Sequence, residues 1–174
     1  MADSSLTKRA LASALKQLMT DQPLQKISIG DICQACMMSR KSFYYHFRDK
    51  YDLMNWIFYT EFVERILSQD VQEENALLRS ICEYFYENRA FYLNALEHTG
   101  QNSFPEYFAE VMQPILSLYF ADLTQDDEAH DFLTGFYADA FLAAIRRWLN
   151  DGSMPPERFI PLITRAIKKP YGSA

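Results

Sequence analysis

The sequence predicts an all-α protein of about nine helices, with an N-terminal three-helix helix-turn-helix domain followed by a C-terminal helical bundle. The chain has 174 residues, of which 49% are hydrophobic, so it is long enough and apolar enough to bury a sizeable core. It contains only 5 Gly and 7 Pro, and its apolar residues recur at helical spacing. No apolar run reaches the roughly 18 residues that a membrane span requires.

The first helix is expected over residues 5–20, ended by Asp21-Gln22-Pro23. Its apolar residues fall on one face at steps of three and four: Leu6, Ala10, Leu11, Ala14, Leu15 and Leu18. Lys8 and Arg9 near its start are equally consistent with a phosphate contact and with a solvated basic pair.

Two short helices are expected next, separated by a tight turn. Ser28 and Ser39 are suited to cap their N-termini, because a serine hydroxyl accepts a free backbone N–H group. Phe43 and Phe47 stand four residues apart and therefore share one face of the second short helix. The remaining positions of this helix carry donors and flat rings: Arg40, Lys41, Ser42, Tyr44, Tyr45 and His46. A buried back and a donor-rich front are what a helix needs to enter the major groove of DNA.

This stretch resembles the DNA-binding domain of the tetracycline-repressor (TetR) family of bacterial regulators. The resemblance is carried by Ser28-Ile29-x-Asp31-Ile32, by the run from Ser39 to Phe47 and by Asp49-Lys50. It covers roughly the first third of the chain. Family members usually have Gly in the turn where this chain has Met37, so either the turn avoids positive φ or a strain of about 1 kcal/mol is tolerated.

The resemblance implies a function and a set of contacts. It implies a homodimer that binds double-stranded operator DNA as a transcriptional regulator, expected to be a repressor. The expected DNA-binding residues are Ser28, Ser39, Arg40, Lys41, Ser42, Tyr44, Tyr45, His46 and Lys50, with Lys50 meeting the DNA backbone. It also implies that the last two helices form the dimer interface and that the fourth helix, expected to run to Gln69, transmits changes to the DNA-binding domain.

The remaining helices are expected over residues 73–86, 88–98, 104–121, 127–150 and 156–169. The last two carry more apolar surface than one bundle needs, which favours pairing across a two-fold axis. The body is rich in aromatic residues, which fit a packed core and a pocket for a small-molecule effector equally well. No effector-binding residue is assigned. The expected domains are residues 1–50 for DNA binding and 51–174 for regulation and dimerisation.

Charge is distributed unevenly along the chain. Residues 1–50 hold eight Lys or Arg against four Asp, a net charge of +4, so the remaining residues carry −10 of the total of −6. The basic charge of the N-terminal domain, in contrast to the acidic remainder, suits it to bind the phosphates of a nucleic acid.

Other chemistries are weaker interpretations. Cys33 and Cys36 form a CxxC pair, but a zinc site needs about two more ligands, so we expect packed free thiols. His98 and His130 are expected to be solvated rather than metal ligands. No catalytic constellation is visible, so we expect no enzyme, no cofactor and no metal. We expect a cytoplasmic protein that does not enter the membrane. The rivals are a protein-binding module and, more remotely, a small helical enzyme.

Overall fold

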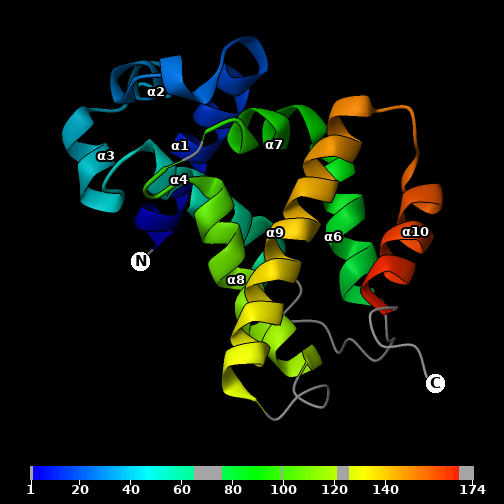
Figure 1. Ribbon diagram of the computed structural model, residues 1–174. Coiled ribbons are helices and arrows are strands. Elements are labelled where there is room, and N and C mark those ends of the chain that lie inside the picture. The colour runs from blue at the N-terminus through cyan, green and yellow to red at the C-terminus, as the bar shows by residue number, and fades with distance from the viewer. Residues whose placement is uncertain (1, 65–75, 99, 121–125, 169–174) are drawn as a thin grey trace, which may run out of the picture. The chain divides into compact units, whose positions relative to one another are not determined.

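The computed structural model describes residues 2–64, 76–98, 100–120 and 126–168, and within these residues it contains nine α-helices and no strand (Figure 1). The helices are α1 (Ala2–Asp21), α2 (Ile29–Ala35), α3 (Arg40–His46), α4 (Lys50–Phe58), α6 (Ala76–Glu87), α7 (Arg89–Leu96), α8 (Phe104–Phe120), α9 (Asp127–Asp151) and α10 (Pro156–Lys168). A short 3₁₀ turn, η1 (Leu24–Lys26), joins α1 to α2. The all-α class expected from the sequence is confirmed.

The fourth helix differs most from its expected form. It is α-helical only from Lys50 to Phe58 and continues as a π-helical segment, η2 (Tyr59–Val63). Such widened turns are rare and occur often at functional sites, and the apolar periodicity did not reveal this one. The expected helix end at Gln69 and the next start at residue 73 lie outside the described residues, as do the expected ends at Ala121 and Lys169.

The chain divides into two compact units, which are described separately. Of the described residues, the first unit contains 2–64, 90–98 and 100–104, and the second contains 76–89, 105–120 and 126–168. The domain expected over residues 1–50 lies within the first unit, which also takes in α4 and most of α7. None of the described helices is long and apolar enough to cross a membrane.

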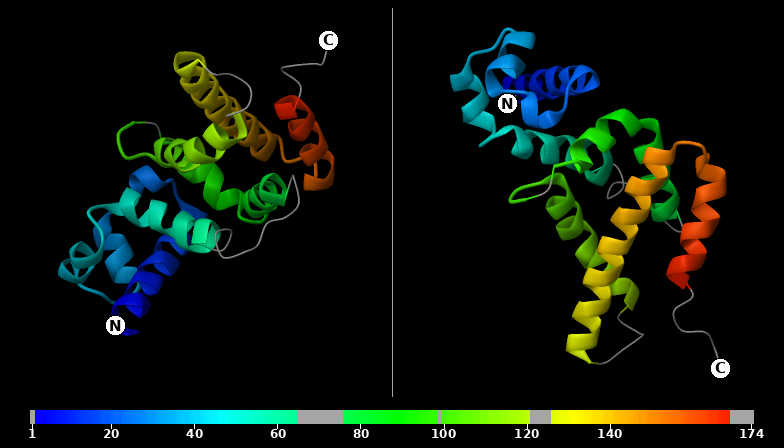
Figure 2. Two further views of the ribbon diagram at one scale, coloured as in Figure 1. Left: turned by 90° about the horizontal axis from the view of Figure 1, so that it is seen from below. Right: turned by 45° about the horizontal axis from the view of Figure 1, so that its top comes forward.

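The helices α1, α2, α3 and α4 pack together in the first unit (Figure 2), and each contributes buried residues to its core. Leu15, Ile32, Phe43 and Leu53, one from each helix, are fully buried. Burying each of these side chains stabilises the fold by about 1.5–3 kcal/mol. The α7 residues Tyr92 and Ala95 are buried in the same unit, and Tyr92 packs edge-on against Phe58 at the end of α4.

The turn between α2 and α3 settles the question raised by Met37. Met37 has φ 55°. The N–H groups of Met38 and Met37 donate to the carbonyls of Cys33 (2.8 Å) and Gln34 (3.2 Å), which is a Schellman motif. Glycine is the usual residue at this left-handed position, so the chain tolerates a strain of roughly 1 kcal/mol here. The Met37 side chain is 95% exposed and meets no steric obstacle outside its own backbone.

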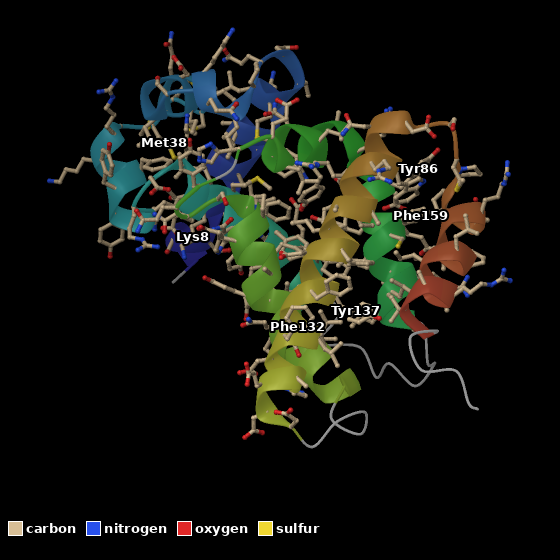
Figure 3. All side chains as sticks on the ribbon, viewed as in Figure 1. Lys8, Met38, Tyr86, Phe132, Tyr137 and Phe159 are labelled. Carbon is tan, nitrogen blue, oxygen red and sulfur yellow. The ribbon has the colours of Figure 1, made fainter. Side chains whose placement is uncertain are left out.

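The second unit is held together by stacked rings on three helices. Trp148 of α9 stacks on Phe159 of α10, with centroids 4.2 Å apart, and also on Tyr86 of α6 at 5.4 Å (Figure 3). The Trp148 indole N–H donates to the Met154 carbonyl at 2.7 Å. The stack fixes α9 and α10 side by side in antiparallel orientation.

The C-terminus of α9 carries a second left-handed cap. Gly152 has φ 64°, and a Cβ atom there would lie 2.6 Å from the Arg89 guanidinium. Arg89 donates to the carbonyls of Leu149 and Asn150, which α9 itself leaves unpaired. A cation at this end also opposes the negative pole of the helix dipole.

One face of α9 leaves large rings in solvent. Phe132 and Phe136 are 68% and 54% exposed and stack on each other with centroids 6.1 Å apart. Ala140 and Ala143 continue the same stripe and are also exposed, as is Leu162 on α10. Large rings exposed side by side on one helix face are typical of a surface that meets a partner.

Candidate nucleic-acid interface

Serine caps define the starts of α2 and α3. The Ser28 hydroxyl accepts the Asp31 N–H at 3.1 Å, and the Asp31 carboxylate accepts the Ser28 N–H at 2.7 Å, which completes a capping box. These hydrogen bonds lower the pKa of Asp31. The Ser39 hydroxyl accepts the Ser42 N–H at 3.1 Å. Each capping hydroxyl keeps its own O–H group as a donor.

The back of α3 is anchored as the spacing of its phenylalanines predicts. Phe43 and Phe47 are buried, with centroids 5.9 Å apart. Phe47 also packs edge-on against Trp56 of α4. These contacts prevent rotation of α3 about its own axis, so its opposite face is held toward solvent.

The front of α3 presents the side chains selected from the sequence. Tyr44 is 58% exposed and Tyr45 is 82% exposed, although both are large and aromatic. Lys41 is exposed beside them, while Ser42 and His46 are half-buried. The structure therefore gathers on one face a cation, two phenol hydroxyls and an imidazole, all of which can donate to phosphate or to base edges.

Arg40 lies at the junction of α2 and α3. A Cβ atom on Gly30 would lie 2.6 Å from the Arg40 guanidinium, so Arg40 extends over the first turn of α2. Its positive charge contributes to the lowered pKa of Asp31. Arg40 is exposed, and its guanidinium can swing away without disturbing the core.

Lys50 lies in a different environment from the one expected of a phosphate ligand. Its ammonium donates to three backbone carbonyls, those of Leu24 (2.7 Å), Gln25 (3.0 Å) and Ile27 (2.7 Å). Burial lowers the pKa of Lys50. An ammonium group has three N–H donors, and all three are used, so none remains for DNA in this arrangement. In this arrangement Lys50 supports the η1 segment, and its expected contact with the DNA backbone stays a prediction.

Further basic residues of the first unit also have partners that the sequence did not reveal. The Lys8 ammonium lies 5.7 Å from the ring centroids of both Phe47 and Trp56. Lys16 forms a salt bridge with Glu61 in the π-helical segment at 2.7 Å. These partners are distant in sequence, and no local pattern indicates them.

The thiols have the surroundings of packed side chains. Cys33 is buried, and the Cys36 thiol donates to the Ile32 carbonyl at 3.3 Å. Burial raises the pKa of both thiols, and it raises the pKa of Cys82 to about 12. Raised pKa values keep these groups protonated and unreactive. The described residues contain no group of three or more His, Cys, Asp or Glu side chains able to hold a metal ion.

His98 and His130 are partly exposed, but each also contacts another residue, which the sequence did not indicate. His98 stacks on Tyr51 of α4, with ring centroids 4.4 Å apart and planes at 12°. His130 is half-buried, with Nε2 3.1 Å from the Ser117 carbonyl. Both imidazoles find neighbours from another helix, which sequence position alone does not show.

A capped α2, a tight turn and an α3 with a buried back and a basic, aromatic front define a helix-turn-helix protein of the DNA-binding class. The family comparisons agree with this class. Residues 11–56 match the family described as bacterial regulatory proteins, tetR family, and residues 72–169 match a TetR-type transcriptional regulator C-terminal region. The chain belongs to the TetR family of transcriptional regulators.

Individual relatives show the same fold. A curated relative from Lactococcus lactis subsp. lactis (strain IL1403), the HTH-type dhaKLM operon transcriptional activator DhaS, is 27% identical over 161 residues, covering 88% of this chain and 84% of its own. A solved structure of the dihydroxyacetone kinase operon activator DhaS has a TM-score of 0.67 at 24% identity, covering 96% of this chain and 98% of its own. NalD, the secondary repressor of the MexAB-OprM multidrug efflux pump in Pseudomonas aeruginosa, has a TM-score of 0.59 at 18% identity, covering 93% and 96%.

Proposed function

We propose that this protein is a homodimeric, cytoplasmic regulator that binds a specific operator sequence through α3. The observation that carries the proposal is the exposure of Tyr44, Tyr45 and Lys41 on a helix whose back is fixed by Phe43 and Phe47. Large rings exposed side by side indicate a missing partner. The basic charge of the first 50 residues makes that partner a polyanion.

The side chains divide into two groups by chemistry. Ser28, Ser39, Ser42, Tyr44 and His46 carry hydroxyl or imidazole donors suited to phosphate oxygens, which position a protein on the duplex. Arg40, Lys41 and Tyr45 are exposed and are assigned to base edges, where lysine and arginine pair with guanine. A dimer must place its two α3 helices about 34–36 Å apart to meet successive major grooves, so the operator is a near-palindrome.

Selection of bound sequences from random duplexes tests this assignment. The wild type should enrich a near-palindrome, and Lys41→Ala should relax the preference at one position in each half-site by about 1–3 kcal/mol. The matched control is Lys26→Ala, because Lys26 is an exposed lysine of the same domain that lies on η1 rather than α3. The base assignment is overturned if Lys41→Ala enriches the same sequences as the wild type and the Lys26→Ala control.

The same selection separates the rival function. A family member that acts only through a partner protein would enrich no sequence from the random pool. The exposed front of α3 supports DNA as the partner, because its donors are arranged along one helical face.

We infer that dimerisation uses α9 and α10. The exposed stripe of Phe132, Phe136, Ala140 and Ala143 combines two rings with two small residues that permit close helix approach. Packing such a stripe on its own copy across a two-fold axis buries both sets of rings.

We propose repression by occupancy of a promoter. NalD is a repressor by name, whereas DhaS is an activator by name, so an experiment must measure the direction of regulation. Transcripts from a reporter under the selected operator should fall when the protein is expressed.

A small-molecule effector is proposed to bind in the second unit. A cavity of about 500 Å³ is lined, among the described residues, by Gln113, Pro114, Ser117, His130, Asp131 and Thr134. The lining is polar rather than aromatic, unlike the ring-lined pocket considered from the sequence. The Thr134 hydroxyl is buried and has no hydrogen-bond partner among the described residues, and a ligand oxygen would remove that cost.

Dihydroxyacetone is the first probe, because the similar protein DhaS is named as the activator of the dihydroxyacetone kinase operon. It should change operator affinity severalfold in the wild type but not in Thr134→Val, measured by fluorescence anisotropy. Thr134→Val preserves shape and removes an unpaired buried hydroxyl, so it should not destabilise the fold. An equal response of both proteins would exclude this cavity as the site.

A further inference from the structure

The Asn94 side chain of α7 makes three hydrogen bonds to the backbone that links α1 to α2. Its Oδ1 accepts the Leu24 N–H at 2.7 Å, and its Nδ2 donates to the carbonyls of Met19 (3.0 Å) and Gln22 (2.9 Å). Asn94 thus provides hydrogen-bond partners for backbone groups at the end of α1 and at the start of η1. All four residues belong to the first unit.

The backbone of Leu24 is held on both sides of its Cα atom. Asn94 accepts its N–H group, while the Lys50 ammonium at the start of α4 donates to its carbonyl at 2.7 Å. The Leu24 side chain is buried, so this residue is fixed by packing as well as by both backbone groups. Helices α7 and α4 are therefore joined through the backbone N–H and C=O groups of a single residue of η1.

The position of η1 determines where the recognition elements begin. Ile27, whose carbonyl also accepts from Lys50, directly precedes the Ser28 cap of α2, and Lys50 follows α3 by a short turn. A shift of η1 would move the start of α2 and the α3–α4 turn together. A second contact reinforces the arrangement, because His98, just after α7, stacks on Tyr51 of α4.

We propose that Asn94 is a positioning residue for DNA binding, which holds η1 and Lys50 so that α2 and α3 keep the geometry that fits the duplex. The proposal rests on the proposed DNA-binding function. It goes beyond that function because Asn94 lies on α7, outside the helix-turn-helix, and touches no DNA. Coupling of this kind passes through a contiguous network of hydrogen bonds with named members.

The test compares Asn94→Ala with Asn88→Ala. Asn88 also uses its side-chain amide to bond a carbonyl, that of Tyr84 at 3.0 Å, and it is similarly half-buried, but it lies in the second unit. Under conditions where circular dichroism shows both variants folded, Asn94→Ala should weaken operator binding about tenfold, equivalent to about 1.4 kcal/mol. Asn88→Ala should bind as the wild type does.

Hydrogen exchange supplies a readout that does not require DNA. Exchange at the Leu24 amide should accelerate at least about tenfold in Asn94→Ala, because its acceptor is gone, and should not change in Asn88→Ala. If Asn94→Ala does not fold, Asn94→Asp replaces it. That variant keeps the Oδ1 acceptor but loses both donations, so Leu24 should stay protected while operator affinity falls.

The proposal is overturned if folded Asn94→Ala binds operator with wild-type affinity, or if exchange at Leu24 is unchanged. For Asn94→Asp, wild-type operator affinity would overturn it in the same way. Failure of the proposed DNA-binding function would give a different result. The wild type itself would then enrich no sequence from the random duplexes, whereas Asn94→Ala would still accelerate exchange at the Leu24 amide.

Discussion

Phe136→Asp is expected to convert the protein into a folded monomer that binds its operator about 10²–10⁴-fold more weakly. A dimer gains this factor because its two DNA-binding domains are linked and bind the two half-sites together. Phe136 is 54% exposed and stacks on Phe132, so a carboxylate there disturbs little within the subunit. Burial of each ring against a second copy contributes roughly 1–2 kcal/mol, and a charge in its place must be desolvated. Sedimentation velocity reports the oligomeric state, and a gel shift reports the affinity.

Leu6→Asp is the matched control for this change. Leu6 is an exposed apolar residue on α1, so the variant carries the same charge away from α9 and should remain a dimer. A Phe136→Asp protein that still sediments as a dimer would show that the interface lies elsewhere.

Lys50→Met is expected to destabilise the first unit by about 3 kcal/mol, because three charge-assisted hydrogen bonds are lost and the carbonyls of Leu24 and Ile27 lose this partner. A loss of this size lowers the melting temperature by about 6–12 °C in a chain of this length. Methionine preserves most of the side-chain length, so the effect reports the ammonium rather than a cavity. Thermal denaturation followed by circular dichroism measures it.

The same variant decides between the two roles considered for Lys50. If Lys50 supports η1, the folded variant should keep the wild-type dependence of operator affinity on salt. If Lys50 instead meets a phosphate, as the family resemblance implies, the fold should be unaffected and the salt slope should flatten by about one unit. Lys26→Met, a change to an exposed lysine on η1, should alter stability by less than about 0.5 kcal/mol.

Patterns confined to neighbouring residues were predictable from the sequence. The caps at Ser28 and Ser39 and the buried pair Phe43 and Phe47 depend on residues three or four positions apart, and the helix-turn-helix signature lies within one continuous stretch. The exposed front of α3 follows directly, because a helix with one face fixed must turn the other outward.

Contacts between distant segments could not be read in this way. Three features depend on backbone groups brought together by packing. They are the π-helical segment after α4, the three carbonyls bound by Lys50 and the hydrogen bond between Asn94 and Leu24. Backbone carbonyls are identical at every position, so no residue type marks which of them a distant side chain will meet.

For this protein, the amino-acid sequence by itself determined the class, the order of the helices and the face of α3 that is exposed to solvent, because periodicity and capping are local properties. Only the tertiary structure decided that Lys50 faces inward, that Asn94 and Lys50 both bind the backbone of Leu24, and that Phe132 and Phe136 are left uncovered on α9. Those outcomes depend on which surfaces meet when the helices pack, and the free energy of packing is distributed over residues far apart in the chain.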